Sequence, residues 1–231
     1  MPHKDEVKVV VTINSTGRQA SSFIRVAAAV GWHVRAQVHK GEGLVAEELA
    51  DLDNVTLIPG ALDDKLFIKA LFKDANLAFI NTTHWGDEYA IGCALADAAN
   101  EAGLEHYVYS SMPDHSTFAQ GWPALPLWAQ KYRVEEYVRK LDMPSTFVYA
   151  GIYNNNFTSL PFPLFRMELQ PDKSFVWQAP FHPHDPLPWL DAEHDVGPAL
   201  LQIFKEGPPR WAGHRYVLHL KTPLGREDTS C

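Results

Sequence analysis

The chain has 231 residues, of which 46% are hydrophobic, and it carries a formal net charge of −8. This size suits one large α/β domain, or one domain with a small appendage, and the acidic balance argues against unaided binding to DNA. The two cysteines give no disulfide framework, and no apolar run reaches membrane-spanning length. The start is not a signal peptide, so we expect a protein of the cytoplasm and nucleus.

The first predicted element is a buried strand that leads through a tight polar turn into a helix. β-Branched residues dominate 7–13, residues 14–18 are polar, and an apolar-periodic segment covers 23–30. Such a strand suits a parallel sheet covered on both faces, and the turn leaves the first N–H groups of the helix free to hold a phosphate. The spacing Asn14-x-x-Gly17-x-x-Ala20 resembles a dinucleotide fingerprint in which Asn replaces the first glycine and Ala the last. Because Asn tolerates left-handed backbone geometry, we favour dinucleotide binding over an ordinary strand–helix turn.

The end of the second predicted strand, 33–39, is where such folds select their cofactor. A carboxylate about 20 residues after the glycines would hold the ribose 2′-OH and repel a 2′-phosphate. Here His39 and Lys40 stand at the strand end, and no acidic residue does. We therefore expect tolerance of both NAD and NADP, although His39 and Lys40 could equally belong to a solvated loop.

The same alternation of strand and helix continues to residue 150. Helices are predicted over 44–49, 65–72, 87–102 and 128–141, and strands over 54–58, 77–81, 106–109 and 146–150. This repeated βα pattern indicates a Rossmann-type, doubly wound parallel sheet. Asp63 and Asp64 could flank an adenine or cap the next helix, and we favour the cap. Cys93 is expected to be a core residue rather than a reactive thiol.

The pattern changes after residue 150. Residues 152–163, rich in Asn and Pro, should not form a regular helix, and the His- and Pro-rich segment 180–188 lacks a fourth distant ligand for a metal. A strand over 175–177, an apolar helix over 198–204 and a closing strand over 216–220 are predicted. We expect three regions, namely a dinucleotide-binding domain over 1–150, a small α+β lobe over 151–220 facing the cofactor crevice, and a tail over 221–231.

Six stretches carry a resemblance to a known family. They are NSTGRQA (14–20), RAQVH (35–39), FINTT (79–83), YSSMPDH (109–115), YAGIYNNNFTSLP (149–161) and WLDAEHDVGP (189–198). Over about residues 7–220 the chain resembles the NmrA-like family of atypical short-chain dehydrogenases/reductases. The resemblance implies a Rossmann fold that prefers oxidised NAD or NADP, senses redox or nitrogen status, and binds a GATA-type zinc-finger activator in nitrogen metabolite repression. An acidic chain suits a basic zinc-finger partner.

The resemblance also implies which residues contact the cofactor. The pyrophosphate would be wrapped by Asn14, Ser15, Thr16, Gly17, Arg18 and Gln19. His39 would lie by the adenosine ribose, Ala61 and Leu62 would flank the adenine, and Lys131 would hold the nicotinamide ribose. Asn81, Thr82 and Thr83 would line the cleft, while the nicotinamide end would be covered by Tyr153, Asn154, Asn155 and Asn156. The Asn run could instead be a loop bonded to its own backbone.

The catalytic pair of short-chain dehydrogenases is incomplete in this sequence. In the Tyr-x-x-x-Lys pair of those enzymes, the lysine lowers the pKa of the tyrosine that exchanges a proton with the substrate. Lys131 matches, but Leu127 replaces the tyrosine and Met112 stands where a serine would orient a carbonyl. We therefore expect a non-catalytic NAD(P)-binding regulator without metal, with Tyr153 as the reserve proton donor. The alternative is an NADPH-dependent reductase of the isoflavone- or quinone-reductase type, because such enzymes can dispense with the tyrosine.

Residues 221–231 depart from the resemblance. Members of the family continue past the closing strand with further helices, whereas these residues show no apolar periodicity. We expect the small lobe to be incomplete and to leave an apolar patch exposed, while the cofactor domain is retained because its strands precede residue 150. A truncated product without a function of its own is the third interpretation.

Overall fold

Seven parallel strands form the central sheet of the computed structural model, which describes residues 7–118, 121–160, 165–178, 182 and 185–219. The strand order is β11-β6-β5-β4-β1-β2-β3. The strands are β1 (Val9–Thr12), β2 (His33–Val38), β3 (Val55–Pro59), β4 (Leu77–Ile80), β5 (His106–Ser111), β6 (Ser145–Ala150) and β11 (Arg215–Leu218). The order reverses between β1 and β4, and at such a switch point the carboxyl ends of the strands open a crevice. The predicted Rossmann-type sheet is therefore confirmed.

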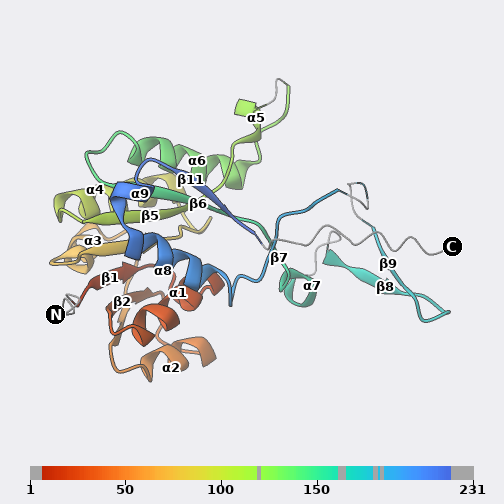
Figure 1. Ribbon diagram of the computed structural model, residues 1–231, viewed down its shortest axis with the longest axis horizontal. Coiled ribbons are helices and arrows are strands. Elements are labelled where there is room, and N and C mark those ends of the chain that lie inside the picture. Colours follow the sequence, from red (N-terminus) through yellow and green to blue (C-terminus); the bar gives the residue numbers. More distant parts are fainter. Residues whose placement is uncertain (1–6, 119–120, 161–164, 179–181, 183–184, 220–231) are drawn as a thin grey trace.

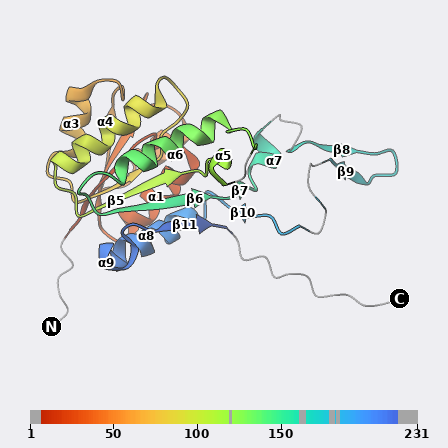
Figure 2. The same cartoon turned by 90° about the horizontal axis from the view of Figure 1, so that it is seen from above.

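Helices cover both faces of this sheet. One layer contains α3 (Lys65–Phe72), α4 (Glu88–Glu101) and α6 (Pro126–Val138), and the other contains α1 (Arg18–Ala29), α2 (Leu44–Ala50) and α8 (Val196–Glu206). Figure 2 shows α3, α4 and α6 on one side of the strands and α8 with α9 (Pro208–Trp211) on the other. The sheet is therefore the middle layer of three, and each face has its own apolar core.

Aromatic packing fixes one of the two cores. The Phe23 ring of α1 lies 5.8 Å from the Phe79 ring of β4 and 5.3 Å from the Phe204 ring of α8. All three side chains are buried. Phe23 thus joins the helix that follows the first turn to both the sheet and the last long helix of the structure.

The helix ends follow the signals read from the sequence. Asp64 accepts hydrogen bonds from the backbone N–H groups of Leu66 and Phe67 at the start of α3, which confirms its predicted role as a cap. Asp87 caps α4 in the same way through the N–H of Ala90. Gly103, with a φ of +69°, follows the end of α4 in the left-handed conformation that glycine adopts without steric cost.

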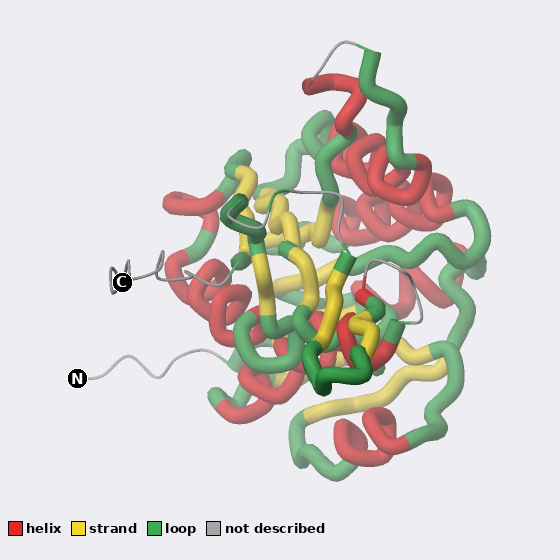
Figure 3. The backbone as a smooth tube through the Cα atoms, turned by 90° about the vertical axis from the view of Figure 1, so that its right-hand side faces the viewer, coloured by secondary structure: helices red, strands yellow, loops and turns green. Residues whose placement is uncertain are grey.

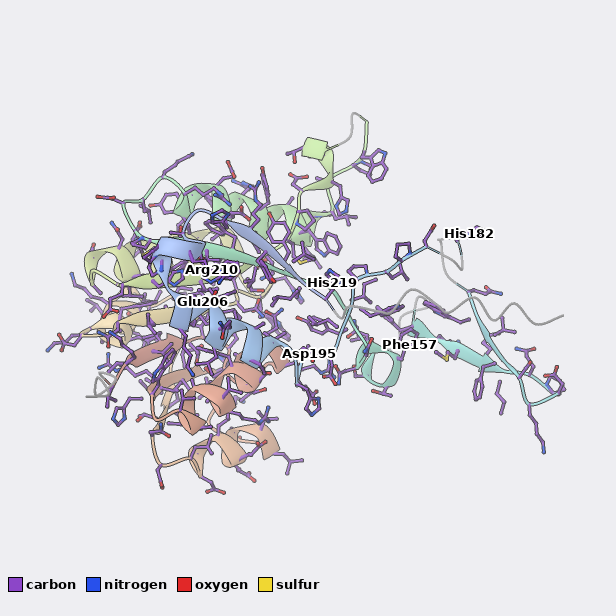
Figure 4. The ribbon with its side chains drawn as sticks, viewed as in Figure 1. Phe157, His182, Asp195, Glu206, Arg210 and His219 are labelled. Carbon is purple, nitrogen blue, oxygen red and sulfur yellow. The ribbon has the colours of Figure 1, made fainter. Side chains whose placement is uncertain are left out.

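The described residues within 152–190 form an extension that projects from the body in Figure 1 and is seen end-on in Figure 3. It contains the parallel pair β7 (Ile152–Tyr153) and β10 (Trp189–Leu190), and the hairpin of β8 (Met167–Leu169) and β9 (Phe175–Trp177). The described residues of 152–163 form no regular helix beyond the single turn α7 (Asn156–Ser159). The hydroxyls of Thr158 and Ser159 bond the carbonyl of Asn155 and hold that turn. Figure 4 shows Phe157 on α7, outside the sheet.

The chain returns to the main body after this extension. β11 pairs with β6 as the edge strand of the sheet, and α8 packs on α1. The N–H of Gly197 donates to the Ser22 hydroxyl at 2.9 Å, and a Cβ at Gly197 would lie 2.4 Å from the Ser22 carbonyl oxygen. The predicted lobe over 151–220 therefore supplies a helix and a strand to the main body, because α8 packs on α1 and β11 pairs with β6, both far back in the sequence.

Further elements lie outside this body. The predicted strand over 175–177 is confirmed as β9, whose Phe175 and Val176 are exposed together with Met167 and Leu169 of β8. α5 (His115–Phe118) is a further single turn before α6. The tail over 221–231 and part of the His- and Pro-rich segment 180–188 lie outside the described residues. Among those that are described, no helix is long and apolar enough to cross a membrane.

Candidate functional site

The turn after β1 is held by hydrogen bonds to its own backbone and to β2. Asn14 has a φ of +48°, the left-handed geometry anticipated from the sequence. Its carbonyl accepts from the N–H of Gly17 at 2.9 Å, and the N–H of Ser15 donates to the carbonyl of Gln37 at 3.0 Å. The buried hydroxyls of Thr12 and Ser15 lie 2.8 Å apart. These hydrogen bonds therefore fix the conformation of the turn at the carboxyl end of β1.

α1 begins directly behind this turn without a side-chain cap. Its N-cap residue is Gly17, and no side chain bonds the first N–H groups of the helix. An uncapped N-terminus of a helix at the sheet's switch point presents N–H donors and the positive end of the helix dipole, which together favour a phosphate group. Thr16 and Gly17 are exposed there, as a ligand contact requires.

The Gln37 side chain of β2 connects the turn after β1 to the loop after β3 by hydrogen bonds. Its Oε1 accepts from the N–H of Asn14 at 2.9 Å, and its Nε2 donates to the carbonyl of Gly60 at 2.7 Å. The side chain is buried. Sequence reasoning missed this residue, although a polar side chain between Ala36 and Val38 in a buried strand is a signal that could have found it.

A cavity of about 650 Å³ opens beside the turn at the carboxyl ends of β1, β2, β3 and β4. Six residues predicted to contact the cofactor line it, namely Asn14, His39, Ala61, Leu62, Thr82 and Thr83. The other lining residues are Gln37, Gly60, Asp63, Lys65, Trp85, Gly86, Asp87, Ala90, Ile91 and Ala94. Apolar walls with a few polar groups are typical of a site for a planar organic ligand.

The wall contributed by α4 and the loop before it was not anticipated. Ala90, Ile91 and Ala94 occupy one side of the first turns of α4, and the Trp85 side chain is 76% exposed in the preceding loop. Gly86 next to it has a φ of +79°. A helix face that turns toward a ligand looks like a core face in the sequence, so periodicity alone could not reveal it.

Lys131 enters the same region from α6. Its ammonium donates to Asn81 Oδ1 at 3.2 Å, to the carbonyl oxygen of Thr82 and to Thr82 Oγ1 at 3.3 Å, and lies 3.1 Å from Glu88 Oε1. The amide of Asn14 donates to the carbonyl of Asn81 at 3.0 Å. The predicted residues of β4, α6 and the first turn are thus connected by direct hydrogen bonds, although Lys131 and Asn81 do not line the cavity.

Gln19 and Tyr153 form a second connection, on the other side of the turn. The Ser110 hydroxyl donates to Gln19 Oε1 at 2.8 Å, and Gln19 Nε2 donates to the Tyr153 hydroxyl. Burial raises the pKa of Tyr153, which keeps the phenol protonated. The Gln19 amide is therefore bonded at both ends to protein groups, while Arg18 pairs with Glu193 at 3.0 Å.

The asparagine run lies in the extension and outside the cavity. The N–H of Asn154 donates to the carbonyl of Leu190, Asn156 begins α7, and the carbonyl of Asn155 accepts from the hydroxyls of α7. The buried Oδ1 of Asn155 has no hydrogen-bond partner among the described residues. These bonds use the backbone of the run, and the Asn155 side chain leaves one acceptor open.

The positions of a short-chain dehydrogenase pair are both on α6. Leu127 is 55% exposed in its first turn, and Lys131 follows one turn later. The Cys93 thiol on α4 is partly buried, and burial raises its pKa, which disfavours the reactive thiolate. No group of three or more metal-ligating side chains occurs in the described part of the chain.

Comparisons with known proteins identify relatives over nearly the whole chain. The sequence profile of the NmrA-like family matches residues 6–222. The nitrogen metabolite repression protein nmrA of Emericella nidulans is 65% identical over 218 residues, which are 93% of this chain and 62% of that protein. The chain therefore spans less than two thirds of that relative's length.

Two solved structures resemble the whole described fold. The crystal structure of NmrA, a negative transcriptional regulator, in complex with NADP is 64% identical, with a TM-score of 0.89 over 93% of this chain and 67% of that one. The NmrA complex with NAD has the same identity and a TM-score of 0.90 over 94% of this chain and 68% of that one. With its parallel sheet, its uncapped first turn and a family match over residues 6–222, the chain belongs to the NmrA-like family.

Proposed function

We propose that this chain is a non-catalytic NAD(P)-binding regulator that acts in nitrogen metabolite repression. The observation that carries the proposal is the uncapped N-terminus of α1, which opens beside a cavity of about 650 Å³ at the switch point of the sheet. The similarity to nmrA of Emericella nidulans and to NmrA structures in complex with NADP or NAD supports it.

The residues present fit a dinucleotide. The first N–H groups of α1 suit the pyrophosphate, and the apolar wall of Ala61, Leu62 and Ile91 suits the adenine. His39, which follows β2, suits the adenosine ribose. The family resemblance suggests that Tyr153 and the asparagine run cover the nicotinamide end. Bound NAD or NADP would supply a nicotinamide ring, whose charge differs between the oxidised and reduced forms. A sensor of redox status requires such a difference.

Both dinucleotides should bind, because the end of β2 carries no carboxylate. His39 lines the cavity and Lys40 follows it. A 2′-phosphate would thus meet no fixed negative charge on that strand end, whereas a carboxylate would repel it. The absence of an acidic residue at this position supports a sensor that accepts both cofactors.

The partner we propose is a GATA-type zinc-finger activator, and the places of action are the cytoplasm and the nucleus. The family resemblance suggests this partner, and the net charge of −8 suits the basic surface of a DNA-binding zinc finger. Binding of the isolated zinc finger to the purified chain, measured at two salt concentrations, tests it. Salt-sensitive binding is expected, and no binding at low salt would contradict the proposal.

The non-catalytic part of the proposal rests on Leu127. A leucine cannot transfer a proton, and the Lys131 ammonium is bonded to Asn81, Thr82 and Glu88 instead of a tyrosine. The alternative is a reductase of the isoflavone- or quinone-reductase type. We expect no steady oxidation of NADPH when quinones or enones are supplied. Turnover that disappears in Lys131→Ala would favour the reductase.

Calorimetric titration with NAD, NADP, NADH and NADPH tests the cofactor proposal. We expect both oxidised forms to bind more tightly than both reduced forms, with similar affinities for NAD and NADP. Preference for NADPH would support the reductase instead. Absence of binding by a chain whose circular dichroism shows it to be folded would reject the dinucleotide site.

A further inference from the structure

A large aromatic side chain in the cavity wall is mostly exposed to solvent. Trp85, in the loop between β4 and α4, lines the cavity, yet 76% of its side chain is exposed. Leaving apolar surface of this size in water forgoes the free energy that its burial would provide. A single exposed tryptophan elsewhere on a surface needs no explanation, whereas one that lines a concave site is a candidate for contact with a ligand.

The residues next to Trp85 restrict the position of its indole. The His84 ring stacks on the indole, with 5.9 Å between the ring centroids and 30° between the ring planes. Gly86 follows with a φ of +79°, and Asp87 accepts from the N–H of Ala90 at 3.0 Å, which caps α4. Because a stacked ring and a capped helix flank it, the indole is ordered before a ligand arrives. An ordered side chain loses less conformational entropy on binding.

The remaining walls of the cavity suit a flat ring beside this indole. Ala61 and Leu62 after β3, together with Ile91 of α4, line the same cavity with apolar surface. Heteroaromatic rings stack on tryptophan, and the contact tolerates different rings because each has a π face. A phosphate or a sugar gains no comparable contact. The indole is therefore suited to the ring of a ligand rather than to its charged or aliphatic parts.

We propose that Trp85 is a ligand-contact residue that stacks on a heteroaromatic ring of the bound dinucleotide. The inference rests on the proposed cofactor function and adds to it a residue that neither the sequence motifs nor the family resemblance indicated. A dinucleotide contains two such rings, adenine and nicotinamide, which offer the same stacking chemistry. AMP contains only the adenine and nicotinamide mononucleotide only the nicotinamide, so these two ligands distinguish the two sources of the ring.

Calorimetric titration of the parent, Trp85→Ala and Trp85→Phe tests the proposal with NAD, the two mononucleotides and inorganic pyrophosphate. We expect Trp85→Ala to weaken NAD binding about tenfold, which is the order of one stacked ring. The mononucleotide that carries the stacked ring should weaken by a similar factor. Trp85→Phe should stay within about threefold of the parent, because a phenyl ring still offers a π face. Pyrophosphate, which has no ring, should bind all three proteins equally.

Trp122→Ala is the matched control. Trp122 is 60% exposed and also stacks on a histidine ring, that of His115 at 6.2 Å, but it is not among the residues that line the cavity. Its removal should change none of the four affinities. An unchanged NAD affinity in Trp85→Ala would overturn the inference. Equal losses of NAD and pyrophosphate would overturn it too, because the indole would then act only through the shape of the loop.

Tryptophan fluorescence reports the contact independently of affinity. A ring stacked on an indole quenches its emission, so NAD should quench the parent, which has seven tryptophans. Trp85→Phe should lose most of that quenching while still binding NAD in the calorimeter, and undiminished quenching in this variant would contradict the stacking. If the folded parent binds neither NAD nor a mononucleotide, the cofactor proposal fails and the inference fails with it. If the parent binds NAD and Trp85→Ala binds it equally well, only the inference fails.

Discussion

His39 occupies the position in the cavity wall where a single charge should decide between two cofactors. Its exposed side chain follows the last residue of β2. Replacing His39 with Asp would put a carboxylate where folds of this kind bind the ribose 2′-OH, and that carboxylate would repel a 2′-phosphate. The affinity for NADP should fall about tenfold or more relative to that for NAD, since Coulomb repulsion between two charges about 4 Å apart near a protein surface exceeds about 1.4 kcal/mol.

The matched control for this change is His33→Asp. His33 is exposed at the opposite end of the same strand, so the substitution alters net charge equally and leaves the cavity untouched. Parallel calorimetric titrations with NAD and NADP would measure both variants. Equal losses of NADP affinity in the two variants would show that His39 does not face the 2′-position.

At the residue scale, the sequence predicted the turn after β1 better than the residues that surround it. Asn14 was identified through the backbone geometry that its spacing demands, and that geometry is present. Gln37 and Glu88 were missed because their roles depend on partners 23 and 6 or more residues away. A buried polar side chain reveals that it needs a partner but not which residue provides one.

At the scale of helices and strands, Glu135 of α6 contacts two other elements of the fold. Its fully buried carboxylate accepts from Arg139 Nη2 at 2.8 Å, from the Tyr149 hydroxyl at 2.8 Å and from Arg215 Nε at 2.5 Å. α6 is thereby fastened to β6 and to the edge strand β11. Removing the charge leaves two guanidinium groups without their shared partner.

We expect Glu135→Gln to lower the free energy of unfolding by roughly 3 kcal/mol, because breaking one side of a buried ion pair costs about that much. The neighbouring Glu136, whose side chain is 45% exposed and 3.2 Å from Arg215, is the control. Glu136→Gln should cost less than about 1 kcal/mol, as exposed pairs do. Urea denaturation compares the two, and equal losses would show that β11 is held by its backbone bonds alone.

Elements with a strong local signal were predicted, and most of the very short ones, β9 excepted, were not. α3 has the bounds expected from its cap and its apolar periodicity, whereas β8, β10 and α9 went unrecognised. These elements contain two to four residues, too few to display either a strand or a helix period. The edge position of β11 depends on β6, which lies more than 60 residues earlier.

At the scale of the whole molecule, a neutral histidine between layers should make stability depend on pH. His106 of β5 is fully buried, its Nε2 lies 2.7 Å from the Thr146 hydroxyl, and its ring meets Phe204 of α8 edge to face. Burial lowers the pKa of His106 to about 4. The folded state therefore binds this proton less readily than the unfolded chain does.

The sign of the effect follows from proton linkage. Above a pH of about 6.5, the histidine pKa in an unfolded chain, both states are neutral and His106 contributes no pH dependence. As pH falls from about 6.5 to about 4, the unfolded chain takes up the proton first, and stability should decrease by roughly 3 kcal/mol. His106→Gln should flatten this decrease, while His33→Gln, at an exposed position, should not. Urea midpoints between these pH values measure it, and an unchanged slope in His106→Gln would contradict the assignment.

The pairing of α1 with α8 has a consequence for how the protein is made. The side chains of Phe23 and Ile24 in α1 are fully buried, and α8, which covers α1, lies about 180 residues later. During synthesis the face of the first helix that α8 covers must therefore stay uncovered until α8 has left the ribosome. Exposed apolar surface on a growing chain is what chaperones bind, so the order of synthesis makes this fold dependent on protection that its finished form no longer needs.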